Sequence, residues 1–199
     1  MQNFVHLRTH SEYSIKEGLL GIDAIIKQAI DNNMPAVALT DLNNLYAVVK
    51  FYKACLANKI KPIIGAEISF INDLNKSSNS NSNPPVNKLI ILVQNQTGYL
   101  NLTKLISRSY YEQNSISGPV IKLSWFTENN GHMGLIVLSA GIDGAIGKLL
   151  LNNKHEEAID EIKLLSKIFD NRFYLEINRI GKINEEKYIE LILPLAAKI

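Results

Sequence analysis

The chain has 199 residues, of which 46% are hydrophobic and 20% are charged, with a net charge of +2 and one cysteine, Cys55. This composition is ordinary for a single globular domain, and the net charge is too small to indicate a nucleic-acid-binding surface by itself. No run approaches the roughly 18 apolar residues of a membrane span, no secretory signal begins the chain, and one cysteine excludes an internal disulfide, so we expect a cytoplasmic protein.

Apolar, β-branched runs alternate with amphipathic helical patterns along the whole chain. The runs predict strands at Phe4–Leu7, Ala36–Thr40, Pro62–Phe70, Lys88–Val93, Leu135–Ser139 and Phe173–Asn178. Helical periodicity predicts helices at Ile22–Ile30, at Asn43–Leu56, from His155 to Phe169 and from Asn184 to the end. Strands that are apolar on both faces and separated by helices are typical of a parallel sheet. The sequence therefore predicts an α/β fold.

The first predicted strand runs into the most informative segment, FVHLRTHSEYS at residues 4–14. Alternate residues of an extended chain share a face, so two histidines that bind one metal from a strand end need a His-x-His spacing. Arg8 stands two residues before His10, and a guanidinium cannot coordinate a cation. His6 lies between two apolar residues, so we expect it to pack rather than to bind metal.

The segment LRTHSEYS resembles the first motif of the polymerase-and-histidinol-phosphatase (PHP) superfamily. Four later segments complete a resemblance to the amino-terminal PHP domain of bacterial replicative DNA polymerase III alpha subunits: MPAVALTDLNNLYAVVKFY, IKPIIGAEISF, NQTGYLNLTKLIS and FYLEINRIG. The resemblance covers essentially the whole chain. It implies that residues 1–199 form one PHP domain, a distorted (βα)7 barrel like that of metal-dependent hydrolases, which stops before its last strand and belongs to a longer polymerase chain.

The resemblance also implies a metal site, whose ligands in active PHP proteins are two histidines, an Asp-His pair and a glutamate among others. This chain retains three of them: His10, Asp41 and Glu67. Three other ligand positions hold residues that cannot bind a divalent cation: Arg8, Leu42 and Ile180. We expect a degenerate pocket without metal, in which Arg8 neutralises Asp41 or Glu67. Two alternatives stay open, namely residual Zn²⁺ or Mn²⁺ binding by the three retained ligands, and a role for Asp41 as a cap of the helix at Asn43–Leu56.

Other features of the sequence favour structural roles. Residues 75–87 are a polar run that predicts a flexible surface loop. Pro194 should kink or split the last helix. The turn at 141–144 is expected to be a plain tight turn, and His132 and His155 are expected to be solvated. Buried Cys55 should be unreactive.

The resemblance implies that nucleotide transfer, with Mg²⁺, occurs at aspartates of a palm domain outside this chain, so that no catalytic residue is expected here. We expect a scaffold that packs on the palm and thumb domains in cis and anchors the proofreading exonuclease (epsilon) subunit. DNA would be reached through the parent polymerase, and no membrane is involved. The alternative is a metal-dependent phosphoesterase or pyrophosphatase. A nucleic-acid-binding module is a third reading, against which the small net charge speaks.

Overall fold

The computed structural model describes residues 4–15, 17–74, 84–112 and 118–197. Within them, strands form one sheet in the order β1-β2-β3-β5-β6, with β4 beside β2. The strands are β1 (Ala36–Leu39), β2 (Lys61–Ile71), β3 (Asn87–Val93), β4 (Ile121–Lys122), β5 (Leu135–Leu138) and β6 (Phe173–Tyr174). This is the mixed α/β architecture that the sequence predicts.

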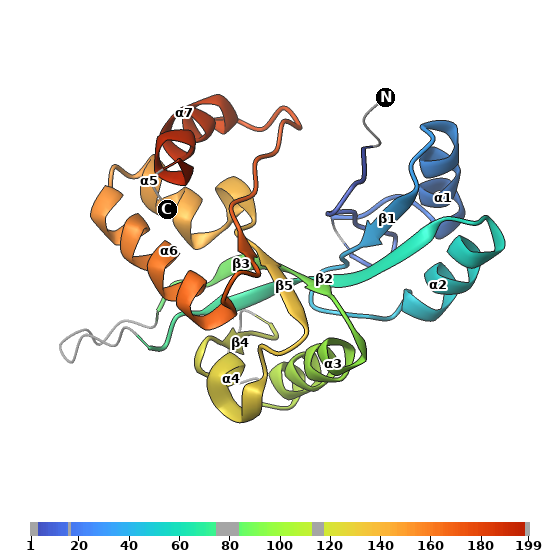
Figure 1. Cartoon of the computed structure of the whole chain (residues 1–199), viewed down its shortest axis with the longest axis horizontal. Helices are drawn as coiled ribbons and strands as arrows, with labels where there is room; N and C mark the ends of the chain where they lie inside the picture. Colours follow the sequence, from blue (N-terminus) through green and yellow to red (C-terminus); the bar gives the residue numbers. More distant parts are fainter. Residues whose placement is uncertain (1–3, 16, 75–83, 113–117, 198–199) are drawn as a thin grey trace.

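Helices flank the sheet in separate groups (Figure 1). The longer ones are α1 (Ile22–Asp31), α2 (Val48–Ala57), α3 (Gln96–Tyr111), α5 (Ala145–Leu151), α6 (His155–Phe169) and α7 (Glu185–Ala196). The short ones are α4 (Ser124–Thr127), η1 (Glu128–Asn130) and η2 (Gly141–Asp143). Among the described residues, no helix combines the length and the apolar character needed to cross a membrane.

The sheet is not wholly parallel, which corrects the simplest expectation from the sequence. β3 is antiparallel to both of its neighbours, β2 and β5, whereas β1 pairs with β2 and β5 with β6 in parallel. A parallel pair needs a crossover connection, usually helical, whereas an antiparallel pair can be joined by a direct return of the chain. The described residues between β2 and β3 contain no such helix. Of the predicted loop at 75–87, residues 75–83 lie outside the described ranges.

The first predicted strand, Phe4–Leu7, is wrong, because these residues form no strand and Leu7 lies in a bend. The segment lies beside β1, where the amide of Ala38 donates to the carbonyl of His6 at 2.9 Å and the amide of Thr40 donates to the carbonyl of Thr9 at 2.9 Å. The amide of Thr9 bonds the Thr40 side-chain hydroxyl at 2.9 Å instead of a backbone carbonyl. A side chain thus replaces one rung of the ladder, and this places residues 8–10 at the end of β1.

Two large apolar clusters hold the fold together, and a third, smaller one joins β1, β3 and β5 through Ala38, Ile90 and Leu138. The larger joins the sheet to α3, α5, α6 and α7, with Phe70, Phe126 and Phe169 among its fully buried side chains. The second packs α1 and α2 on β1 and contains Phe51 and Cys55. Burial raises the pKa of the Cys55 thiol to about 11, which keeps the reactive thiolate scarce, as the sequence predicts.

Two predicted helices have different bounds in the structure. The helix expected from Asn43 begins only at Val48, because Asn43 has a left-handed backbone with a φ of 53° and turns at residues 43 and 46–47 precede the helix. The last helix, α7, continues to Ala196 and is not split at Pro194. Pro194 lies in the final turn, where the loss of one backbone hydrogen bond and the ring's steric demand affect little helix beyond it.

Candidate functional site

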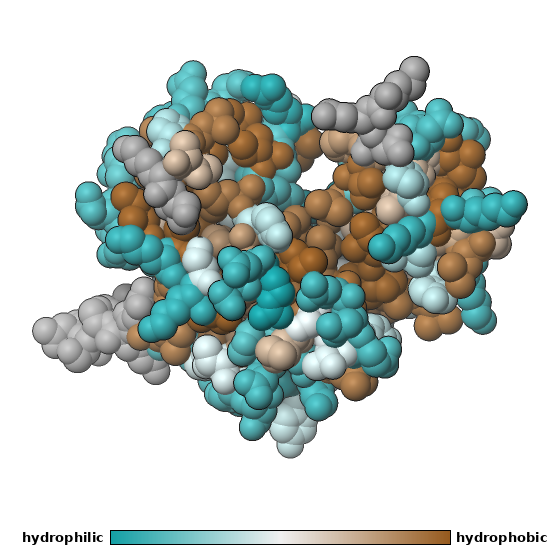
Figure 2. Space-filling model, in the orientation of Figure 1, coloured by the Kyte–Doolittle hydropathy of each residue, from teal (hydrophilic) through white to brown (hydrophobic). Residues whose placement is uncertain are grey.

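A cleft of about 1560 Å³ opens between the amino-terminal segment and the segment that follows β6. The surface is hollowed between these two parts of the molecule (Figure 2). Apolar side chains of both segments line much of it. Its lining also includes ionisable side chains from distant parts of the sequence: Arg8, His10, Glu17, Lys88, Asp143, Glu176 and Lys182.

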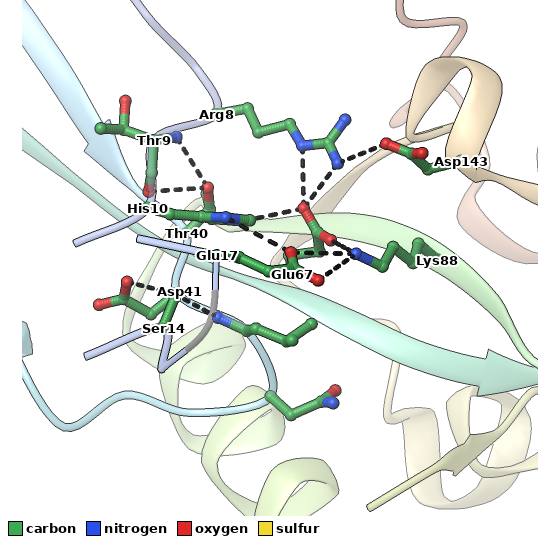
Figure 3. A network of polar contacts seen from close by, with 12 residues as sticks. Arg8, Thr9, His10, Ser14, Glu17, Thr40, Asp41, Glu67, Lys88 and Asp143 are labelled. Atoms are coloured by element: carbon green, nitrogen blue, oxygen red, sulfur yellow. Dashed lines mark hydrogen bonds and ion pairs between the residues drawn. The ribbon is translucent and has the colours of Figure 1, made fainter. Parts of the chain in front are cut away.

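Glu67, on β2, is the centre of a polar network that includes Arg8, His10 and Lys88 of the cleft lining (Figure 3). Its side chain is 0% exposed. Oε2 accepts a hydrogen bond from Arg8 Nε at 2.9 Å and lies 2.8 Å from Arg8 Nη2 and 3.0 Å from His10 Nε2. Oε1 accepts no hydrogen bond of good geometry, but Lys88 Nζ lies 2.6 Å from it as an ion pair. A buried carboxylate therefore holds two cationic side chains and an imidazole.

Arg8 joins Glu67 to two further carboxylates. Its Nη2 donates to Asp143 Oδ2 at 3.1 Å, and its Nη1 lies 3.7 Å from Glu176 Oε2. In the amide orientation that satisfies its neighbours, Asn178 accepts from Arg8 Nη1 at 3.1 Å and donates to Glu176 Oε1 at 3.2 Å. One guanidinium thus ties β2 to η2 and to the segment after β6. Of the two partners that the sequence offered for Arg8, the structure selects Glu67.

Asp41 follows β1 and binds a backbone amide and two hydroxyl groups of the amino-terminal loop instead. Its Oδ1 accepts from the amide of Ser11 at 2.7 Å and from the hydroxyl of Ser14 at 2.6 Å, and its Oδ2 accepts from the hydroxyl of Ser11 at 2.7 Å. The helix-cap alternative is wrong, because α2 begins at Val48 and has no side-chain cap. The 1% exposed carboxylate fastens the loop that carries His10.

The family model for the PHP domain matches residues 6–180. The chain belongs to the PHP domain family. Among curated proteins it is 40% identical to the DNA polymerase III subunit alpha of Buchnera aphidicola subsp. Acyrthosiphon pisum over 97% of this chain. It is 39% identical to that of Pseudomonas fluorescens over 99% of the chain and 38% identical to that of Escherichia coli K12 over 97%. The chain spans 16% of the length of each of these relatives.

A solved structure shares the fold over the whole chain. A putative metal-dependent phosphoesterase from Bifidobacterium adolescentis superposes with a TM-score of 0.64 over 100% of this chain and 84% of that one, at 11% identity. At this identity the likeness concerns the fold alone. It agrees with the predicted architecture of a PHP-type, metal-dependent-hydrolase-like barrel.

The PHP fold implies a metal site, and the donors in this cleft can be compared with one. Among the described residues, His10, Glu17 and Glu67 have ligand atoms within 4.8 Å of one another. The carboxylate oxygens are already engaged, because Lys88 Nζ lies 2.6 Å from Glu67 and 3.2 Å from both oxygens of Glu17. A metal ion cannot share that space with an ammonium group, so the side chains as arranged do not fit one.

The other ligand positions named from the sequence do not complete a site. Asp41, predicted as a residual ligand, has its oxygens committed to Ser11 and Ser14. Leu42 contributes its backbone, which bridges to Glu67 and donates from its amide to Ser14 Oγ at 3.0 Å. Ile180 lines the cleft with 67% of its surface exposed. The sequence missed Glu17, Lys88, Asp143, Glu176 and Lys182. Of these residues, only Asp143 lies in a segment that the sequence analysis singled out, the turn at 141–144.

The ionisation of the cluster follows from burial and charge pairing. Burial by itself raises the pKa of Glu67, but the close contacts with His10 and Lys88 and the charge of Arg8 outweigh it and lower the pKa to about 2. Burial also raises the pKa of Glu176, and Arg8 only partly offsets this. Lys182, 2.8 Å from Asp143, and Arg8 overcome burial to lower the pKa of Asp143. The surroundings therefore favour the charged forms of Glu67 and Asp143.

Glu67 should make the domain sensitive to acid. Its pKa is depressed from 4.5 to about 2, so its contribution is fully present above pH 4.5 and is lost as the pH falls toward 2. We expect the free energy of unfolding to fall across this window, and Glu67→Gln to reduce that fall. Urea unfolding at a series of pH values measures it, with the exposed Glu190→Gln as the control. Parallel curves for wild type and Glu67→Gln would contradict the prediction.

The remaining histidines lie outside the cluster. His6 is exposed rather than packed in the core, and its ring meets that of Phe4 edge-to-face at 4.9 Å. His132 is half-buried, with Nδ1 3.0 Å from the carbonyl of Phe126, so the prediction that it is solvated is wrong. His155 is exposed, as predicted.

Proposed function

We propose that this chain is the amino-terminal PHP domain of a DNA polymerase III alpha subunit and acts there as a scaffold without metal. The similarity to alpha subunits along 97–99% of the chain supports the first part. The second part rests on one observation, that the central carboxylate of the pocket, Glu67, is neutralised by the side chains of Arg8 and Lys88. A carboxylate that is paired with two cationic side chains is not available as a metal ligand, and without a metal the pocket cannot activate water.

The parent protein, in this proposal, is a DNA-directed DNA polymerase of the cytoplasm. Its Mg²⁺-dependent aspartates and its contacts with DNA belong to parts of the polymerase outside these 199 residues. The PHP domain packs on the palm and thumb domains of the same polypeptide and anchors the proofreading exonuclease subunit. Its ion-pair network acts as a structural tie, because it joins β2, β3, η2 and the amino-terminal segment across the cleft.

The second candidate function is that of a metal-dependent phosphoesterase or pyrophosphatase. The convergence of His10, Glu17 and Glu67 within 4.8 Å is the observation that favours it. The ammonium of Lys88 among these donors argues against it.

Phosphatase assays separate the two functions. We expect the parent polymerase that contains this domain to release no phosphate from p-nitrophenyl phosphate or pyrophosphate with Zn²⁺ or Mn²⁺ present. Its Glu67→Ala variant should give the same background rate. Hydrolysis that follows the protein through purification and disappears in Glu67→Ala would establish the phosphoesterase instead.

Binding assays test the scaffold itself. In the full-length chain, Glu67→Ala should lower the melting temperature, and above that temperature both exonuclease co-purification and primer extension should decline together. The exposed Glu190→Ala is the control. An exonuclease that binds equally well to a chain whose PHP domain is unfolded would rule out the anchoring role.

A further inference from the structure

We propose that the ammonium group of Lys88 takes the place of a metal ion among three donor side chains, those of His10, Glu17 and Glu67. The inference deepens the proposed metal-free scaffold and rests on it, because it names the side chain that keeps a divalent ion out. Removal of this one ammonium should convert the pocket into a site for Zn²⁺ or Mn²⁺.

The position of Lys88 between the donors is the first argument. Its Nζ lies 2.6 Å from Glu67 Oε1 and 3.2 Å from each oxygen of Glu17. His10 is close to the same carboxylates, with Nε2 3.0 Å from Glu67 and Nδ1 3.8 Å from Glu17. The ammonium thus stands among carboxylates that would otherwise face each other, as Figure 3 shows.

The sheet register explains why Lys88 reaches this point. In the antiparallel pair of β2 and β3, Glu67 is opposite Ile90 and Ser69 is opposite Lys88. Alternate residues of a strand share a face, so Lys88 lies on the same face as Glu67 and diagonally across from it. A four-carbon side chain spans that diagonal distance. The placement therefore follows from rigid strands and not from a chance rotamer on a loop.

The charges of the cluster give the second argument. Glu67 is fully buried, and its Oε1 accepts no hydrogen bond within the described structure, so its partner at that oxygen is the Lys88 charge alone. Without Lys88, Glu67 would keep only the Arg8 charge, and the Glu17 carboxylate would face Glu67 and the His10 imidazole without an ammonium between them. Carboxylate and imidazole donors in that combination suit Zn²⁺ and Mn²⁺.

Lysine variants of the full-length chain test the proposal with Zn²⁺ or Mn²⁺ alone as the probe. Lys88→Met should bind one more equivalent of metal than wild type, measured by elemental analysis after gel filtration, and should gain melting temperature when metal is added. Lys148→Met is the matched control, because the Lys148 ammonium is nearby but bonds Val86 and Asn87 rather than the carboxylates. Adding Glu17→Gln to Lys88→Met should abolish the extra equivalent.

A folded Lys88→Met chain that takes up no more metal than wild type would overturn the inference. So would uptake that Glu17→Gln leaves unchanged. If the variant does not fold, competitive acetylation of the wild-type protein tests the inference instead. The Lys88 ammonium, paired with Glu67 and Glu17, should be acetylated far more slowly than that of the exposed Lys53. Equal reaction of Lys88 and Lys53 would overturn the inference. A lack of extra metal uptake by Lys88→Met leaves the scaffold proposal intact, because that proposal is tested by wild-type hydrolysis and by exonuclease binding.

Discussion

Glu67→Ala is expected to lower the free energy of unfolding by about 3–5 kcal/mol, because it leaves the partly buried cations of Arg8 and Lys88 without their common partner. Urea unfolding at neutral pH measures the change, with the exposed Glu190→Ala as the control. A loss no larger than that of the control would mean that water replaces Glu67 without cost and that the network does not stabilise the fold.

Arg8→Ala should destabilise in the same direction but by less, because Lys88 and His10 remain on Glu67. The double variant of Arg8 and Glu67 then measures their coupling. We expect the two losses to be strongly non-additive, since the second substitution removes the carboxylate that the first left underpaired. Arg8→Lys should restore only part of the stability, because an ammonium cannot reach Glu67, Asp143 and Glu176 together. Additive losses would show that the two side chains act independently.

Asp41→Ala is expected to cost about 2–4 kcal/mol, because it orphans three donors of Ser11 and Ser14 around a carboxylate that is 1% exposed. The loop at 11–14 should loosen, and His10 with it. Thermal unfolding measures the loss, and Asp160→Ala, on an exposed carboxylate, is the control. Asp41→Asn should lose less, because its amide oxygen still accepts. Melting temperatures of Asp41→Ala within a degree of the control would disprove the fastening role.

The two carboxylates show where sequence reasoning succeeded and where it failed. The motif pattern selected both Asp41 and Glu67, and Arg8 as the cation, without any coordinates. The pattern could not show which acid pairs with Arg8 and which binds the loop, because Asp41 follows one apolar run and Glu67 lies within the next. Only the register, which places Glu67 on the same face of the sheet as Lys88, and the fold of the 11–14 loop over Asp41 separate them. The sequence did not indicate that Lys88 pairs with Glu67, because Glu67 is 21 positions away along the chain, on the adjoining strand.

The sequence by itself determined the α/β class, most strands and helices, and the family. These depend on local periodicity and on the identity of side chains, which are readable along one chain. The tertiary structure alone decided that β3 runs antiparallel, that Asp41 fastens a loop and that Lys88, Asp143 and Glu176 complete the cluster. Such contacts join residues up to 168 positions apart, as with Arg8 and Glu176, and ion pairing depends on distance in space rather than along the chain.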